Sequence, residues 1–278
     1  MRLSTSVFGL GVSDPMAAPR VIKPGIQVFE YENYHRYKID GQWAIGVTTA
    51  LKGVPKDALK YWAAGVVADF ALSNLRQLSW TLESAGYGPA RRMLTEIPNE
   101  KRDTAGARGT EVHLLAERYI RDEEIEVSDT VMPYVRGYAN YISDFNPTSV
   151  HEELVVASRE HMYAGRLDSI QRVPALGLIQ VDYKTSRGVY GEHALQCAAY
   201  EHAEVYVDVE GNEVPMPVLD GSFILHIQPD TYDLIPVQTD DAVFRKFLTA
   251  LANYRENVQS NKLAKLLGEP VRPPEVAA

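Results

Sequence analysis

The stretch that decides the fold is GRLDSIQRVPALGLIQVDYK, residues 165–184. Runs rich in Val, Ile and Leu predict one strand over residues 162–173 and another over residues 176–184, joined by a hairpin turn. Apolar and polar residues alternate along the second run, so Asp182 and Lys184 share one face of the strand. The strand is therefore expected to pack its apolar face on the core and to present a carboxylate and an ammonium on the other.

The same hairpin brings a second acid to this face. Adjacent antiparallel strands can place Asp168 beside Asp182, and two converging carboxylates repel each other unless a cation lies between them. Mg²⁺ and Mn²⁺ prefer such oxygen ligands and often join carboxylates to a substrate phosphate. The pattern predicts a divalent-metal site at Asp168 and Asp182 with Lys184 beside it. For Asp182 and Lys184 alone, the alternative is a solvated strand face with an incidental pair.

The flanking segments predict an α/β arrangement around a mixed sheet. An aromatic-rich segment with a turn at Asp40-Gly41 predicts an N-terminal hairpin or small sheet over residues 27–46. Helical spacing predicts helices over residues 55–83, 90–95, from 103 or 104 onward, 130–145, 192–205 and 241–257. The remaining strands are expected at residues 153–157, 222–228 and 232–237. A loop at Ile97-Pro98-Asn99 is expected to end the helix over residues 90–95.

Composition limits the class of protein. A hydrophobic fraction of 45% and a charged fraction of 23% are typical of a soluble globular protein. The net charge of −9 argues against a broad, nonspecific phosphate binder, so any contact with nucleic acid must be local. Neither a signal peptide nor an apolar run of about 20 residues is visible, which predicts a cytoplasmic protein. The single cysteine, Cys197, excludes an intramolecular disulfide and a four-cysteine metal site within one chain.

Two further groups of residues are candidates for contacts with a substrate. Gln196 and Tyr200 lie four residues apart and so share a helix face, from which they can reach a phosphate or a base. Half-buried helix positions without a function are the alternative. Basic residues are densest just before residue 113 and can line a groove for a phosphate backbone, although a solvated charged face explains them equally well: Arg91, Arg92, Lys101, Arg102 and Arg108.

As an ordered set, these motifs resemble those of a known family. The segments are Gly165-Arg166-Leu167-Asp168, Asp182-Tyr183-Lys184-Thr185-Ser186, and Gln196 with Tyr200. They resemble the motif series of RecB-like nucleases in the PD-(D/E)XK superfamily. The upstream segment from Arg108 to His113 is similar to the helix-borne histidine motif of those nucleases. The wider chain, including Trp62-Ala63-Ala64 and Arg102-Asp103, resembles exonucleases of tailed bacteriophages that are related to CRISPR-associated RecB-like exonucleases.

The resemblance implies a restriction-endonuclease-like α/β core, with a mixed central sheet flanked by helices, an N-terminal β-hairpin and a helical extension. The expected division is an N-terminal extension with the hairpin (1–55), a nuclease domain (56–265) and a disordered tail (266–278). Within the nuclease domain, residues 56–148 are expected to be helical and residues 149–265 to form the catalytic sheet core.

The resemblance also implies roles for individual residues. His113, Asp168, Asp182 and the backbone carbonyl of Tyr183 would bind Mg²⁺ or Mn²⁺, and Lys184 would orient the attacking water or help to deprotonate it. Gln196, Tyr200, Arg108 and Arg187 would contact DNA. Independently of the resemblance, Glu153 at the start of the first core strand is a candidate acid either behind the metal ligands or for a second metal. Many CRISPR-associated relatives carry four cysteines for an iron–sulfur cluster, and with Cys197 alone this chain is expected to have none.

The expected activity is that of a divalent-metal-dependent DNA nuclease, an exonuclease in phage DNA recombination, repair or replication. Its expected place is the cytoplasm, that of the host if a phage encodes the protein. The expected partner is DNA and not a membrane; a homo-oligomer and a single-strand annealing or recombination partner fit the same picture. The alternatives are a noncatalytic nucleic-acid-binding protein with the nuclease fold, an endonuclease of the superfamily, and a metal-dependent phosphodiesterase acting on nucleotides.

Overall fold

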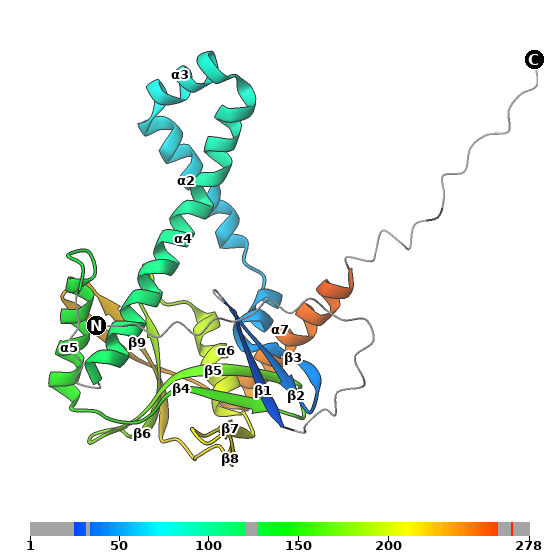
Figure 1. The fold of residues 1–278 in the computed structure, drawn as a ribbon, viewed down its shortest axis with the longest axis vertical. Coiled ribbons are helices and arrows are strands. Elements are labelled where there is room, and N and C mark those ends of the chain that lie inside the picture. The colour runs from blue at the N-terminus through cyan, green and yellow to red at the C-terminus, as the bar shows by residue number, and fades with distance from the viewer. Residues whose placement is uncertain (1–24, 32–33, 121–126, 261–267, 269–278) are drawn as a thin grey trace, which may run out of the picture.

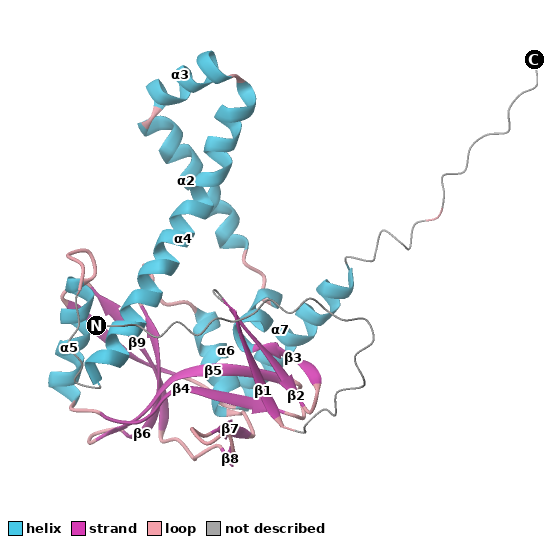
Figure 2. Ribbon diagram, in the orientation of Figure 1, coloured by secondary structure: helices cyan, strands magenta, loops and turns pink. Residues whose placement is uncertain are grey.

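The structure, a computed structural model, describes residues 25–31, 34–120, 127–260 and 268; some side chains within helices, including those of Arg108 and His113, fall outside the description. Helices flank a curled mixed sheet (Figures 1 and 2). The predicted α/β class, with a mixed sheet flanked by helices, is confirmed. The tail over residues 266–278 that was predicted to be disordered lies outside the described residues, except for Gly268.

Ten strands of the described residues form one sheet. They are β1 (Ile26–Tyr31), β2 (Tyr34–Ile39), β3 (Gln42–Gly46), β4 (Thr148–Ser158), β5 (Tyr163–Val173), β6 (Gly177–Lys184), β7 (Val205–Val207), β8 (Glu213–Pro215), β9 (Gly221–Gln228) and β10 (Thr231–Val237). The order along the main path is β1-β2-β3-β5-β4-β7-β8. Strand β6 joins β5 to β9, and β10 pairs with β9.

The helices are α1 (Val47–Ala50), α2 (Asp57–Ser73), α3 (Leu75–Ala85), α4 (Tyr87–Ile120), α5 (Met132–Phe145), α6 (Gly191–Glu201) and α7 (Asp241–Ser260), with a 3₁₀ turn η1 (Leu51–Gly53) after α1. No helix in the described ranges combines the length and the apolar character that crossing a membrane requires.

Strands β5 and β6 form the antiparallel hairpin that the sequence predicts. Ser169 lies opposite Val181 and Ile170 opposite Gln180. On its other edge, β6 runs parallel to β9, so β6 lies inside the sheet. An interior strand with one apolar face toward a helix layer explains the alternation seen in the sequence.

The edge of β5 that faces β6 is shared by two strands. Near its start, Tyr163 and Ala164 pair in parallel with β3. From Ser169 onward, the same edge pairs with β6, while β4 occupies the opposite edge. Among the described residues no strand pairs with this edge between the two ladders. The sheet therefore forks beside Asp168, and the small N-terminal sheet is continuous with the main one.

Helices cover both faces of the sheet. One core cluster joins α1, α6 and α7 to β4 and β5 through residues such as Tyr200, Phe247 and Leu167. A second cluster joins α4 and α5 to β6 and β9 through residues such as Tyr138 and Val181. The polar face of β6 consequently lies toward α6, and its apolar face toward α5.

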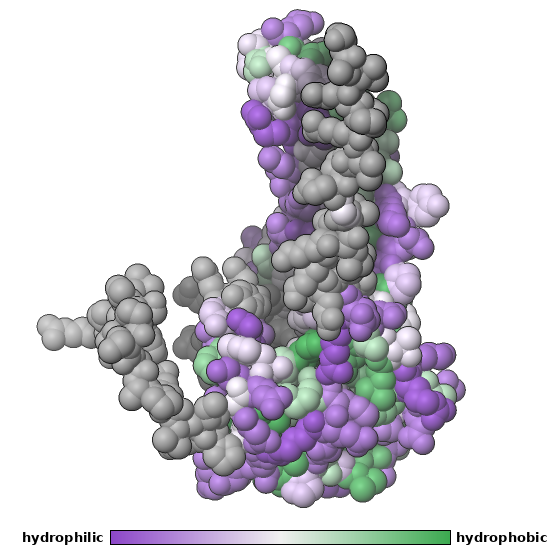
Figure 3. Space-filling model, turned by 90° about the vertical axis from the view of Figure 1, so that its right-hand side faces the viewer, coloured by the Kyte–Doolittle hydropathy of each residue, from purple (hydrophilic) through white to green (hydrophobic). Residues whose placement is uncertain are grey.

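Helices α2 and α3 and the first part of α4 project from the body as a helical arm (Figure 1). The side view shows hydrophobic and hydrophilic residues mixed over the arm (Figure 3). Large apolar side chains on the arm are exposed, among them Tyr61, Leu72 and Trp80. Most of the arm thus lies outside the cores that hold the sheet together.

The single helix predicted over residues 55–83 is wrong, because α2 ends at Ser73 and α3 begins at Leu75. Asn74 separates them with non-helical backbone angles, and its side-chain amide donates to the Phe70 carbonyl at 2.9 Å. An asparagine that hydrogen-bonds to the backbone in this way competes with the regular helix.

The loop predicted at Ile97-Pro98-Asn99 is also wrong, because α4 continues through Pro98. A proline inside a helix removes one hydrogen bond and costs about 3 kcal/mol. Ile97 is buried, and α4 packs against α2 and α3. We infer that this packing offsets the local cost.

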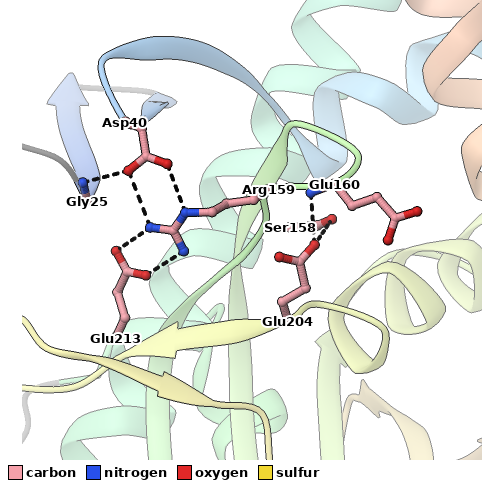
Figure 4. A network of polar contacts seen from close by, with 7 residues as sticks. All are labelled: Gly25, Asp40, Ser158, Arg159, Glu160, Glu204 and Glu213. Carbon is pink, nitrogen blue, oxygen red and sulfur yellow. Dashed lines mark hydrogen bonds and ion pairs between the residues drawn. The ribbon is translucent and has the colours of Figure 1, made fainter.

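An ion-pair cluster fixes the turn between β2 and β3 to the far edge of the sheet (Figure 4). Arg159 donates through Nε to Asp40 at 2.9 Å and through Nη2 to Glu213 at 2.7 Å. Asp40 also accepts the N–H of Gly25 at 2.8 Å. The Arg159 guanidinium lowers the pKa of both carboxyl groups, so they stay ionised. These ion pairs hold the N-terminal strands β1 to β3 in place.

Candidate active site

Asp168 lies where the sheet forks. Pairing between β5 and β6 stops at Ser169 and Val181, and beyond it the Tyr183 N–H donates to Asp168 Oδ2 at 2.7 Å. The Asp168 carboxylate thus takes the place of a strand partner for this amide. It is thereby fixed beside Asp182, the next residue of β6 after the last paired position.

Asp182 points toward α6 and is held there. The Gln196 amide donates to Asp182 Oδ1 at 2.8 Å and lies 3.1 Å from the Tyr200 hydroxyl oxygen. A Cβ at Gly165 would lie 2.7 Å from the Tyr200 ring, so only glycine leaves room for that ring. Gly165 on β5, Tyr200 and Gln196 on α6, and Asp182 on β6 all belong to the sequence motifs. Each is in contact with the next in this order.

Lys184 forms an ion pair with Asp182 Oδ2. The Asp182 side chain is 3% exposed and that of Lys184 19%. Burial alone lowers the pKa of Lys184, but the Asp182 and Asp168 carboxylates outweigh it and raise that pKa above its usual value. Lys184 is therefore a firmly protonated cation between two carboxylates.

Tyr183 ties this site to the core behind it. Its hydroxyl accepts a hydrogen bond from Gln171 at 2.7 Å, and Tyr141 donates to Gln171 at 2.6 Å. Burial raises the pKa of Tyr183 well above its usual value, so the phenol stays neutral. The backbone that anchors Asp168 is thus fixed from the α5 side of the sheet.

The motif upstream of the sheet lies on α4, which passes close to the end of β6. A Cβ at Gly109 would lie 3.2 Å from Thr185 Oγ1. His113 is one helical turn further along α4, about 6 Å away at 1.5 Å per residue. The side chains of His113 and Arg108 lie outside the described residues. The helix that carries the histidine motif therefore reaches the site.

Two further candidates are Arg187 and Glu153. Glu153 lies across from Asp168, because its neighbours Glu152 and Leu154 pair with Ser169 and Leu167. Arg187 is exposed in the segment after β6. Glu153 has φ of 51° in β4, and its carboxylate lies 3.7 Å from Arg166, which also forms a 2.6 Å ion pair with Glu30. Glu153 is thus directed to a guanidinium on the neighbouring strand.

Two histidines that the sequence analysis left without a role lie beside Lys184. His226 occupies the position of β9 in register with Lys184, and its Nε2 is 2.8 Å from the Ser186 carbonyl. Burial, followed by the charges of Lys184 and Lys56, lowers the pKa of His193 to about 4. No spacing in the sequence reveals His226, because β6 and β9 pair in parallel across a long insertion.

The donor set suits a hard divalent cation. Asp168 and Asp182 supply carboxylate oxygens on one face, the ligand type that Mg²⁺ and Mn²⁺ take, and such ions usually keep several waters. Among the side chains that the structure describes, no three His, Cys, Asp or Glu residues are grouped to hold a metal. The described residues therefore fit an ion completed by water and substrate oxygens.

No protein-family model and no curated protein sequence matches the chain. Among solved structures, it is similar to an alkaline exonuclease from Laribacter hongkongensis, with a TM-score of 0.32 and 13% identity over 57% of this chain and 86% of the other. It is also similar to a protein named SSO0001, with a TM-score of 0.29 and 17% identity over 77% and 75% of the two chains. Both TM-scores are too low to support a function here.

Proposed function

We propose that this protein is a divalent-metal-dependent nuclease that hydrolyses phosphodiester bonds in DNA. The observation that supports the proposal best is the gathering of Asp168, Asp182 and Lys184 on one face of the forked sheet. Two carboxylates and a cation in a partly dehydrated site suit a reaction that moves negative charge onto phosphate oxygens. A structural ion pair would not need the second carboxylate.

The proposed metal ligands are Asp168, Asp182, the Tyr183 carbonyl and His113. When bound, Mg²⁺ or Mn²⁺ supplies Lewis-acid polarisation of the scissile phosphate and activation of a water nucleophile. Gln196 holds Asp182 in its orientation, and the Tyr183 N–H does the same for Asp168. Hydrogen bonds of this kind fix the orientation of carboxylates that bind a metal.

Lys184 acts as a positive charge in this proposal. It orients the nucleophile and stabilises charge on the phosphate. Gln196 and Tyr200 are buried and bonded within the site, and we assign them a positioning role in place of direct contact with DNA. Arg108 and Arg187 stay candidates for phosphate contacts.

The exonuclease mode, and a place in phage DNA recombination, repair or replication, rest on the motif series. The test is end-labelled linear DNA and covalently closed circular DNA, each incubated with Mg²⁺, Mn²⁺ or EDTA. We expect metal-dependent loss of linear DNA only. Cleavage of closed circles would indicate an endonuclease instead, and tight binding with no cleavage under any metal would indicate a noncatalytic binder.

The site itself is tested by Lys184→Ala and Asp182→Asn. Each removes a charge at the reacting phosphate, and we expect a fall in the cleavage rate of about a hundredfold or more. Lys246→Ala, which removes an exposed lysine on α7, is the matched control and should cleave normally. Circular dichroism confirms folding of each variant. Cleavage that survives both site substitutions would refute the assignment.

A further inference from the structure

A cleft of about 640 Å³ lies between the helical arm and the start of α6. Lys56 and Trp62 line it from the base of α2, and Lys101 and Arg102 from α4. Tyr190 and Glu192 close it at the start of α6. The volume is in the range of small-molecule sites, roughly 300–1,000 Å³, so the cleft is large enough to hold part of a single nucleic-acid strand.

The chemistry of the lining is that of a single-strand site. Trp62 is 42% exposed and Tyr190 58%, so both rings are open to a ligand. Proteins that hold single strands combine such stacking surfaces with cations that track the phosphates. Lys101 and Arg102 supply the cations from one turn of α4.

The acids of the lining are already neutralised. Asp57 forms a 2.8 Å ion pair with Lys60, and Glu192 a 2.9 Å pair with Lys56. Arg102 pairs with Asp103, with both side chains 68% exposed. An exposed pair of this kind is worth at most about 1 kcal/mol, so the guanidinium can exchange it for a phosphate.

The cleft adjoins the start of α6, the helix that carries Gln196 of the candidate site. The Tyr190 ring lies edge-on to His193, with ring centroids 5.8 Å apart. His193 in turn lies within electrostatic reach of both Lys56 in the cleft and Lys184 in the site. One turn further along α6, Gln196 holds Asp182. A strand in the cleft would therefore have its next phosphate directed toward Asp182 and Lys184.

We propose that this cleft binds a single-stranded end of DNA, with bases stacked on Trp62 and Tyr190 and phosphates held by Lys101 and Arg102. The proposal rests on the proposed function for the fate of that strand, but the binding does not depend on cleavage. It makes the arm a part of the substrate path: the arm selects an unpaired strand, and the site in the sheet cleaves it.

The test is fluorescence anisotropy of the full chain with a labelled single-stranded oligonucleotide in EDTA, where no cleavage occurs. We expect Trp62→Ala to weaken binding about tenfold or more, since one stacking aromatic contributes roughly that much. Lys101→Glu should also weaken it, and because Lys101 is exposed this variant carries little risk of misfolding. The matched controls are Trp80→Ala on α3, 68% exposed, and Lys246→Glu on α7.

Normal binding by both cleft variants would overturn the proposal, as would equal binding of a blunt duplex. Its failure differs from that of the proposed function. If Lys184→Ala binds the strand normally but does not cleave, both stand. If the wild type never cleaves but Trp62→Ala loses binding, only the nuclease proposal fails. If cleavage is metal-dependent and Trp62→Ala binds normally, only the cleft proposal fails.

Discussion

Asp182 shows what a single buried carboxylate requires. Its two oxygens are engaged by different elements, one by Gln196 of α6 and the other by Lys184 of its own strand. An ionised side chain with so little exposure would cost several kcal/mol without such partners. Gln196 therefore fixes both the charge and the direction of the carboxylate.

We expect Gln196→Ala to weaken the metal response. Loss of an outer hydrogen bond typically costs a factor of about 10 to 100 in metal affinity or activity. The cleavage rate measured against Mg²⁺ concentration should shift to higher Mg²⁺, with much of the rate recovered at saturation. Gln77→Ala on the exposed face of α3 is the control. An unchanged dependence of the cleavage rate on Mg²⁺ would refute the positioning role of Gln196.

At the scale of elements, α5 is held unusually close to the turn between β9 and β10. A Cβ at Gly137 would lie 2.4 Å from the Thr231 carbonyl oxygen and 2.5 Å from that of Gln228. The Asp230 N–H in that turn also donates to the Pro133 carbonyl at 2.7 Å. Glycine at position 137 is what allows this approach.

We expect Gly137→Ala to lower the free energy of unfolding by about 1–3 kcal/mol, because α5 must move away from the turn. Gly65→Ala is the matched variant: a Cβ there meets nothing within 4 Å, and alanine is the better helix former by about 0.5–1 kcal/mol. Urea unfolding of the two variants should therefore give shifts of opposite sign. A stabilised Gly137→Ala would contradict the close packing.

The elements that could be predicted from the sequence are those whose pattern is local. Alternation gave the faces of β6, and the hairpin that placed Asp168 near Asp182 needed only adjacent strands. The pairing of β3 with β5, and of β6 with β9, joins distant segments and left His226 unrecognised. At Asn74 a continuous helix was predicted, but a side-chain hydrogen bond ends it there. At Pro98 a loop was predicted, but packing keeps the helix continuous.

At the scale of the whole molecule, the net charge is negative, but basic residues gather locally in the cleft. Acids outnumber basic residues by 37 to 28, for a net charge of −9. A polyanion is therefore repelled by the molecule in general and attracted only where cations gather. Lys101 and Arg102 in the cleft are such a group.

This distribution predicts a weak dependence of strand binding on salt. For single strands the slope of log affinity against log salt is about −0.7 per neutralised phosphate, so Lys101 and Arg102 together give about −1.4. Anisotropy titrations from low to moderate salt in EDTA measure it. A much steeper slope would mean that the strand follows a longer basic track, and Lys101→Glu should flatten whichever slope is found.

Tyr183 has a consequence for anyone who tries to evolve this protein. Its backbone holds Asp168, while its ring ends a buried chain of hydrogen bonds through Gln171 and Tyr141. Substitutions that repack that core are expected to shift the peptide that orients Asp168, the proposed metal ligand. Substitutions around Tyr183, Gln171 and Tyr141 should therefore change the stability and the proposed cleavage rate together. Substitutions on the arm should change the proposed substrate binding without this coupling.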